Sequence, residues 1–173
     1  MDALQPVASR VPLLTVPGNH ESCWPGAGTA WNTSSLDSGG ECGVAYARRF
    51  PMPRPASAAA PWYSFSSGPV HFVAISTEHD LSPSSPQLAW LEADLAAAAE
   101  AAVPWKVLIA HRFFYIDSSG GAADNAAGRA LLDGGLEALM LRFGVVLSIT
   151  GHHHSYQRAW LFACAAAFAC NDI

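Results

Sequence analysis

Runs of apolar residues alternate with polar and glycine-rich segments along the chain, and they predict an order of strands and helices. The run 11–18 (VPLLTVPG) ends in Pro-Gly and predicts a short strand, and residues 62–77 (WYSFSSGPVHFVAIST) predict a hairpin around Ser-Gly-Pro. Residues 104–110 (PWKVLIA) and 145–150 (VVLSIT) are unbroken apolar runs. Such runs are typical of strands that are buried on both faces.

The segments between these strands have helical spacing or the composition of a loop. Residues 82–102 repeat leucine on one helical face, and Ser84 or Ser85 can cap the first turn. Residues 125–144 predict a second helix, which a Gly-Gly pair weakens and a final glycine ends. Residues 19–61 are rich in Gly, Ser and Pro and predict a long ordered loop, a kind of segment that is usually functional. Alternation of strands and helices predicts an α/β fold with a sheet covered on both faces.

Side chains able to bind metals follow three of the predicted strands, in VPGNHE, VLIAHR and SITGHHH. Because ligands gather at the carboxyl ends of strands in such sheets, Asn19 with His20, His111, and the triple histidine predict a common site. Imidazole and amide oxygen are both metal ligands. His152 and His154 are two residues apart and would share one side of an extended segment, so they could serve two adjacent metals. A dinuclear centre is the usual device for hydrolysing phosphate esters.

The remaining histidines have less specific interpretations. His71 lies in the middle of a predicted strand and His79 in a loop, and we expect both to be structural or solvated. His153 would point away from its two neighbours, as a surface residue or as a contact for substrate.

Composition limits the classes of function. The chain has 173 residues, of which 51% are hydrophobic and 13% charged, so one compact domain is expected. A net charge of −5 argues against nucleic-acid binding, and no apolar run approaches the roughly 20 residues of a membrane span. Four cysteines form no CxxC pair, which excludes a zinc ribbon and leaves disulfides open. The triplet Asn32–Ser34 has the form of a glycosylation sequon.

The motifs GNHE, AHR and GHHHSYQR, in this order and spacing, resemble the third to fifth metal motifs of the purple acid phosphatases, within the calcineurin-like metallophosphoesterases. The stretches DSGGECGVAYARRFPMP and WYSFSSGPVHFVAISTEHDLSPSSPQLAWLEADL are similar to the plant and algal branch. The resemblance covers residues 2–158. It implies a partial metallophosphoesterase domain over residues 1–160, the C-terminal part of an αββα sandwich with mixed β-sheets, followed by a divergent apolar tail at 161–173.

The resemblance also implies the role of each site residue. Asn19, His111 and His152 would bind a divalent metal, and His154 would bind the ferric iron of a binuclear centre in which Fe³⁺ is joined by Zn²⁺, Mn²⁺ or Fe²⁺. His20 would hydrogen-bond the substrate phosphate and help to protonate the leaving group. The implied reaction is hydrolysis of a small phosphate monoester by a metal-activated hydroxide, in a full-length protein that is secreted or vacuolar.

Other residues near the motifs have implied roles that do not involve metal ligation. Glu21 would orient its neighbours. Arg112, Tyr115 and His153 would line the place where substrate enters.

The family's two earlier metal motifs have no match in this chain. They supply an aspartate, a metal-bridging aspartate and a tyrosine upstream of GNHE, but only 17 residues precede Gly18, and their single acid is Asp2. We therefore expect an N-terminally truncated chain without a signal peptide, with apolar strand edges left beside Gly18 and Ala110. Two unit positive charges about 3.5 Å apart repel by roughly 5 kcal/mol at an effective dielectric of 20. Without bridging carboxylates we expect at most one weakly held divalent metal, and the alternative is a catalytically inactive metal-binding fragment or pseudoenzyme.

Overall fold

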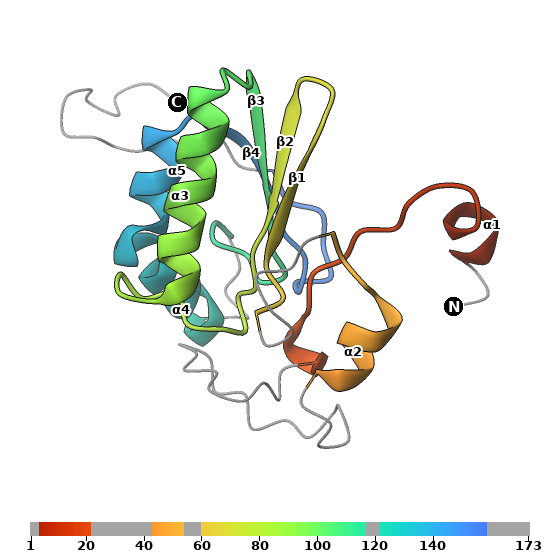
Figure 1. Ribbon diagram of the computed structural model, residues 1–173. Helices are drawn as coiled ribbons and strands as arrows, with labels where there is room; N and C mark the ends of the chain where they lie inside the picture. Colours follow the sequence, from red (N-terminus) through yellow and green to blue (C-terminus); the bar gives the residue numbers. More distant parts are fainter. Residues whose placement is uncertain (1–3, 22–42, 54–59, 117–121, 159–173) are drawn as a thin grey trace.

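Four strands form one mixed sheet in the order β1-β2-β3-β4 (Figure 1). The computed structural model describes residues 4–21, 43–53, 60–116 and 122–158. The fold is α/β, as the alternation of strands and helices predicted. The strands are β1 (Tyr63–Ser67), β2 (Val70–Ala74), β3 (Trp105–Ile109) and β4 (Val145–Ile149).

The register of the sheet brings the ends of three strands together. β1 and β2 form the predicted antiparallel hairpin, which turns at Gly68 with a φ of 56°. β2, β3 and β4 are parallel, and Ala74 pairs with Ile109, which pairs with Ile149. The carboxyl ends of these three strands therefore lie at one edge of the sheet.

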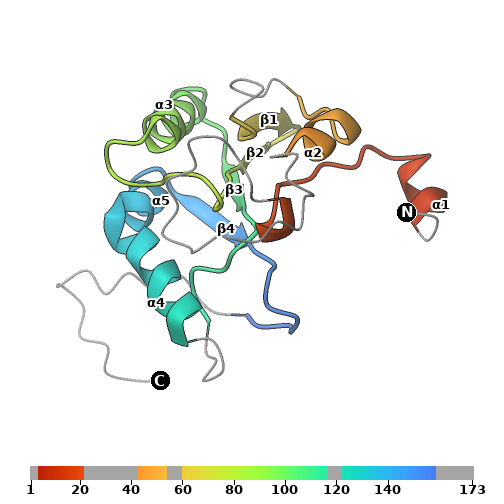
Figure 2. The ribbon, with the colours of Figure 1, turned by 90° about the horizontal axis from the view of Figure 1, so that it is seen from below.

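Three helices pack on one face of the sheet, and the segment containing α2 lies on the other (Figures 1 and 2). The helix predicted over 82–102 is α3 (Pro86–Glu100), and the Ser85 side chain caps it by accepting a hydrogen bond from the Leu88 amide at 3.1 Å. Its leucines join a core with β2, β3 and the following helices. The members of that core are Val73, Ile75, Leu81, Leu88, Leu91, Leu95, Leu108, Ala110, Phe114, Leu131, Leu132, Leu136, Leu139 and Met140.

The helix predicted over 125–144 is divided at its glycine pair. α4 (Ala122–Leu131) and α5 (Glu137–Arg142) are joined by a π-helical turn in which Gly135 has a φ of 116°. Only glycine adopts that conformation readily, so the weak point that the sequence predicted is a true break. Gly144, with a φ of 67°, follows α5 and ends the helical segment as expected.

The prediction of a strand over residues 11–18 is wrong. After a short helix, α1 (Gln5–Ala8), this segment runs without strand pairing in the described part of the chain. Its backbone is held by side chains instead, because the hydroxyls of Tyr46 and Tyr63 each donate to the Thr15 carbonyl at 2.9 Å. An apolar run becomes a strand only where a neighbouring strand accepts its ladder hydrogen bonds.

The loop predicted over residues 19–61 contains regular structure. A 3₁₀ turn spans Asn19–Glu21, and α2 (Val44–Arg49) begins after Gly43, whose φ of 74° suits glycine. The Tyr46 ring anchors α2 by its hydroxyl bond to Thr15. The sequon, all four cysteines and the tail 161–173 lie outside the described residues.

β4 is less buried than its composition predicted. Val146, Leu147 and Ile149 are 48–49% exposed, although β3 beside it is largely buried. The apolar edge expected beside Ala110 is absent, because β3, which precedes Ala110, pairs with β2 on one side and with β4 on the other. Within the described residues β4 is the last strand of the sheet, so the exposed apolar side chains belong to the strand beyond it. No helix among the described residues is long and apolar enough to cross a membrane.

His71 and His79 are structural, as expected. His71 is buried and binds Asp94 on α3 through Nε2 at 2.8 Å and Ser66 on β1 through Nδ1 at 2.9 Å. His79 is buried in the segment after β2 and binds the Ser76 hydroxyl at 2.8 Å.

Candidate metal site

Three predicted ligands converge beyond the carboxyl edge of the sheet. Asn19 lies in the 3₁₀ turn, His111 follows β3 and His152 follows β4. The Asn19 Oδ1 atom is 2.8 Å from His111 Nε2 and 3.1 Å from His152 Nδ1, and the two ring nitrogens are 3.2 Å apart. Atoms bound at about 2.0–2.2 Å to one first-row metal lie about 3 Å from one another. The oxygen and the two nitrogens therefore have the spacing of a shared cation shell.

The backbone around this triangle is arranged for close approach. A Cβ atom on Gly18 would lie 2.8–2.9 Å from three atoms of the His111 ring, so only glycine lets the two loops meet here. The Gly151 amide donates to the His111 carbonyl at 2.8 Å, which ties the loops after β3 and β4 together. His152 has a φ of 67°, a conformation that costs free energy for a residue other than glycine and is typical of functional sites.

His111 is kept neutral by its surroundings. Burial is the largest cause that lowers the pKa of His111 to about 4. Coulombic interactions with three neighbouring side chains act in the same direction, in decreasing order His152, Arg112 and His20. A neutral imidazole retains the lone pair that a metal ligand needs.

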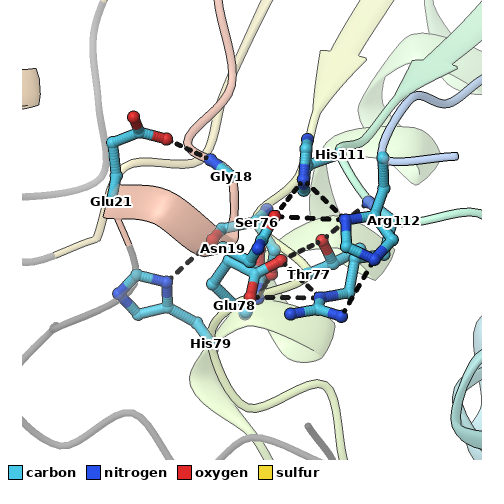
Figure 3. A network of polar contacts seen from close by, with 11 residues as sticks. Gly18, Asn19, Glu21, Ser76, Thr77, Glu78, His79, His111 and Arg112 are labelled. Atoms are coloured by element: carbon cyan, nitrogen blue, oxygen red, sulfur yellow. Dashed lines mark hydrogen bonds and ion pairs between the residues drawn. The ribbon is translucent and has the colours of Figure 1, made fainter. Parts of the chain in front are cut away.

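A buried ion pair between Arg112 and Glu78 lies beside the triangle (Figure 3). The Arg112 side chain is 6% exposed, and its Nε donates to Glu78 Oε1 at 2.9 Å and to Oε2 at 3.2 Å. Thr77 accepts from the Arg112 amide at 3.0 Å and donates to Glu78 at 3.1 Å. Arg112 Nη1 is 3.4 Å from His152 Nε2. Arg112 is therefore buried and paired with a carboxylate, whereas the resemblance implied a position where substrate enters.

His20 lies beside the triangle at a pocket of about 240 Å³. Its side chain is exposed, and its coulombic interaction with His111 contributes to the lowered pKa of His111. Glu21 accepts a hydrogen bond from the Gly18 amide at 3.0 Å and so orients the turn, as expected. The pocket is lined by His20, Glu21, Gly43, Ala45, Tyr46, Arg49 and Phe50.

The last predicted ligand, His154, is not part of the triangle. Its side chain is exposed, and no hydrogen bond joins it to Asn19, His111 or His152 in the described part of the chain. No group of three or more His, Cys, Asp or Glu side chains that could hold a metal occurs among the described residues, so the triangle reaches three ligands only with the asparagine.

A smaller pocket of about 60 Å³ is lined by Gly151, Tyr115 and His153, among other residues. His153 is exposed and binds the Ser155 hydroxyl at 2.7 Å, so it is a surface residue. The Tyr115 hydroxyl donates to Glu137 on α5 at 2.6 Å, which anchors the segment after β3.

Comparison with known proteins shows which family this chain resembles. Residues 1–156 match the family model described as calcineurin-like phosphoesterase. The chain is similar to "Probable inactive purple acid phosphatase 1" of Arabidopsis thaliana, with 35% identity over 90% of this chain and 25% of that protein. It is also similar to the human "Acid phosphatase type 7", with 33% identity over 92% of this chain and 35% of that protein.

A solved structure agrees with the sequence relatives. Purple acid phosphatase PPD1 from yellow lupin seeds has a TM-score of 0.73 and 33% identity, over 88% of this chain and 26% of that chain. The chain spans about a quarter to a third of the lengths of these relatives. The converging motifs and the mixed sheet are consistent with the family match over residues 1–156. The chain belongs to the calcineurin-like phosphoesterase family.

Proposed function

We propose that Asn19, His111 and His152 bind one divalent cation, and that the complete site hydrolyses phosphate monoesters as an acid phosphatase. The observation that carries the proposal is the triangle of one oxygen and two nitrogens with sides of 2.8, 3.1 and 3.2 Å. These groups suit Zn²⁺, Mn²⁺ or Fe²⁺. A bound cation of this kind lowers the pKa of a bound water and polarises a phosphoryl oxygen.

The protein's own residues would orient the substrate and move a proton. His20 neighbours the triangle and is exposed at the mouth of the 240 Å³ pocket. An exposed imidazole in this position can hydrogen-bond a phosphate oxygen and donate its proton to the leaving oxygen of the ester. The pocket beside it, with Tyr46, Arg49 and Phe50 in its wall, would receive the alcohol portion of a small phosphate ester.

A binuclear centre requires more ligands than the described residues bring to the triangle. We propose that His154 contributes to the ferric site of the complete protein, with Zn²⁺, Mn²⁺ or Fe²⁺ at the triangle. Among the residues that the structure describes, we assign only His154 to that second metal, and its side chain is exposed. We therefore expect at most one divalent metal per chain, held weakly.

A second candidate is a catalytically inactive metal-binding fragment or pseudoenzyme. Two relatives with 35% and 34% identity are named as probable inactive purple acid phosphatases, which favours this alternative. Hydrolysis of p-nitrophenyl phosphate at acid pH, with Zn²⁺, Mn²⁺ or Fe²⁺ added, separates the two candidates. Turnover that disappears in His20→Ala supports the phosphatase, and metal binding without turnover supports the pseudoenzyme.

Both candidate functions assume that Asn19, His111 and His152 bind a metal, and metal analysis by mass spectrometry tests this assumption. We expect up to one Zn²⁺ per chain, lost in Asn19→Ala and His152→Ala and retained in His153→Ala, which removes an exposed histidine beside the site. Two tightly held metals, or binding that survives both ligand variants, would contradict the assignment.

We also propose that the full-length protein is secreted or vacuolar. A fluorescent fusion of the full-length protein that stays in the cytosol would overturn this.

A further inference from the structure

The environment of His152 is unusual for a metal ligand. A histidine that binds a metal through one ring nitrogen normally donates the proton of the other nitrogen to a carboxylate, a carbonyl or water. The nitrogen of His152 outside the triangle, Nε2, faces the Arg112 guanidinium at 3.4 Å. A guanidinium has five N–H donors and no acceptor. Arg112 therefore presents a donor to this nitrogen, whereas an acceptor is usual beside a metal-binding histidine.

This contact determines where the ring proton of a neutral His152 lies. A hydrogen bond from Arg112 requires the lone pair on Nε2, which places the ring proton on Nδ1. That proton points to the Asn19 oxygen, which is 3.1 Å away. Nδ1 is also the atom that would bind the cation, so ligation requires the proton to move from Nδ1 to Nε2 while the ring stays neutral. After that move two donors, Nε2–H and Arg112, would face each other.

Arg112 cannot easily turn aside, because its other contacts are buried. Glu78 is fully buried and accepts from Arg112 Nε through both oxygens, at 2.9 and 3.2 Å. Thr77 holds the Arg112 backbone amide and the Glu78 carboxylate at once. Moving the guanidinium would leave a carboxylate without its counter-ion in the interior, which costs several kcal/mol.

We propose that Arg112, held by Glu78, is a positioning residue that keeps the ring proton of His152 on Nδ1 and thereby weakens cation binding at the triangle. This inference rests on the proposed function, because it assumes that the triangle binds a cation. It adds to that function a residue that lowers metal affinity. Arg112 aligns the ring of His152, and the same contact disfavours the tautomer that binds metal.

The test uses the double variant Arg112→Gln/Glu78→Gln and its Zn²⁺ affinity. The paired amides avoid a buried unpaired charge, and the amide at position 112 can accept a hydrogen bond as well as donate one. We expect Zn²⁺ to bind about tenfold more tightly than to the wild-type chain, the scale of changes in groups that support metal ligands. The matched control is Arg142→Gln/Glu92→Gln, which neutralises an exposed pair with a 2.7 Å contact far from the triangle and should leave affinity unchanged.

A second measurement needs neither metal nor variant. Proton–nitrogen correlation spectra of the ¹⁵N-labelled, metal-free wild-type chain report which ring nitrogen of each neutral histidine carries the proton. We expect His152 protonated on Nδ1, and a loss of that preference in the double variant. Should the double variant not fold, Arg112→Lys keeps the charge opposite Glu78 without the forked donor, and we expect a smaller rise in affinity.

The outcomes separate this inference from the proposed function. Wild-type His152 protonated on Nε2, or a folded double variant that binds Zn²⁺ no more tightly than the wild-type chain, overturns the inference even where the wild-type chain binds Zn²⁺. Absence of Zn²⁺ binding to the wild-type chain at any concentration, together with binding by the double variant, supports the inference. Zn²⁺ binding that survives in both Asn19→Ala and His152→Ala overturns the proposed function.

Discussion

Replacing Gly18 by alanine tests whether the position of the His111 ring decides cation affinity. The new Cβ atom would lie 2.8 Å from His111 Cε1 and 2.9 Å from each ring nitrogen. Carbon atoms in contact prefer separations of about 3.5–4.0 Å. The ring or the loop must therefore move by about 0.7 Å, which exceeds the roughly 0.2 Å tolerance of metal–ligand distances.

The size of the effect follows from where the strain is relieved. Inserting a methyl group into a close-packed site costs about 1–3 kcal/mol. If the ring of His111 yields, that free energy appears as a loss in Zn²⁺ affinity of about 5- to 150-fold. If the ring of His111 keeps its position, the strain stays in the folded chain and appears as a loss in the free energy of unfolding instead.

Gly151→Ala provides the matched control, because this glycine also borders His111. Its Cβ would lie 3.7 Å from the His111 carbonyl oxygen and 4.0 Å from Nδ1, which is ordinary contact. Competition with a chelating dye measures Zn²⁺ affinity, and urea unfolding of the metal-free chains measures stability. We expect only Gly18→Ala to change. Equal affinity and equal stability for the two variants would refute the argument that the glycine makes room for the ring.

Three further changes test other parts of the structure. Gly128→Ala would put a methyl group 2.7 Å from a backbone carbonyl oxygen, so urea unfolding should show a loss of about 1–3 kcal/mol, whereas Gly134→Ala meets open space and should gain about 0.4–1 kcal/mol; equal midpoints would contradict this. Burial lowers the pKa of His79 to about 4, below the 6.5 of the unfolded chain. The unfolded chain therefore takes up the proton first, and stability falls as the pH drops from 6.5 toward 4. His79→Gln should flatten that dependence in urea titrations, and parallel curves would count against it. Tyr63→Phe removes a buried 2.9 Å hydrogen bond to the Thr15 carbonyl, so we expect a loss of about 1 kcal/mol, and an unchanged melting temperature would disprove it.

The sequence was sufficient to predict the elements whose signals are local. The serine before Pro86 capped α3 as expected, and the glycine pair broke the second helical segment at Gly135. Convergence of His111 and His152 was also predictable, because the parallel strands β3 and β4 align their carboxyl ends. Asn19 reaches the same place from a segment that is not a strand, so strand alignment does not account for its position.

Features that depend on distant partners were not predictable in the same way. Residues 11–18 have the composition of a strand, but their backbone is held by two tyrosine hydroxyls from later in the chain. The pairing of Arg112 with Glu78 joins residues 34 positions apart. A signal for Glu78 did exist, since it follows β2, the third parallel strand, and so reaches the same edge of the sheet as the metal motifs. The residue pattern does not indicate that Glu78 is buried, although this burial is what makes it costly to move Arg112.

The spacing of the three ligands along the chain has a consequence for folding. Asn19 is 92 residues from His111 and 133 from His152, so a cation shared by them would act as a cross-link that closes two long loops. Because the unfolded chain rarely brings such distant residues together, binding would be confined to the folded molecule. A thermal-shift titration with Zn²⁺ would therefore report whether the turn at Asn19 and the segments after β3 and β4 are held together in the folded chain.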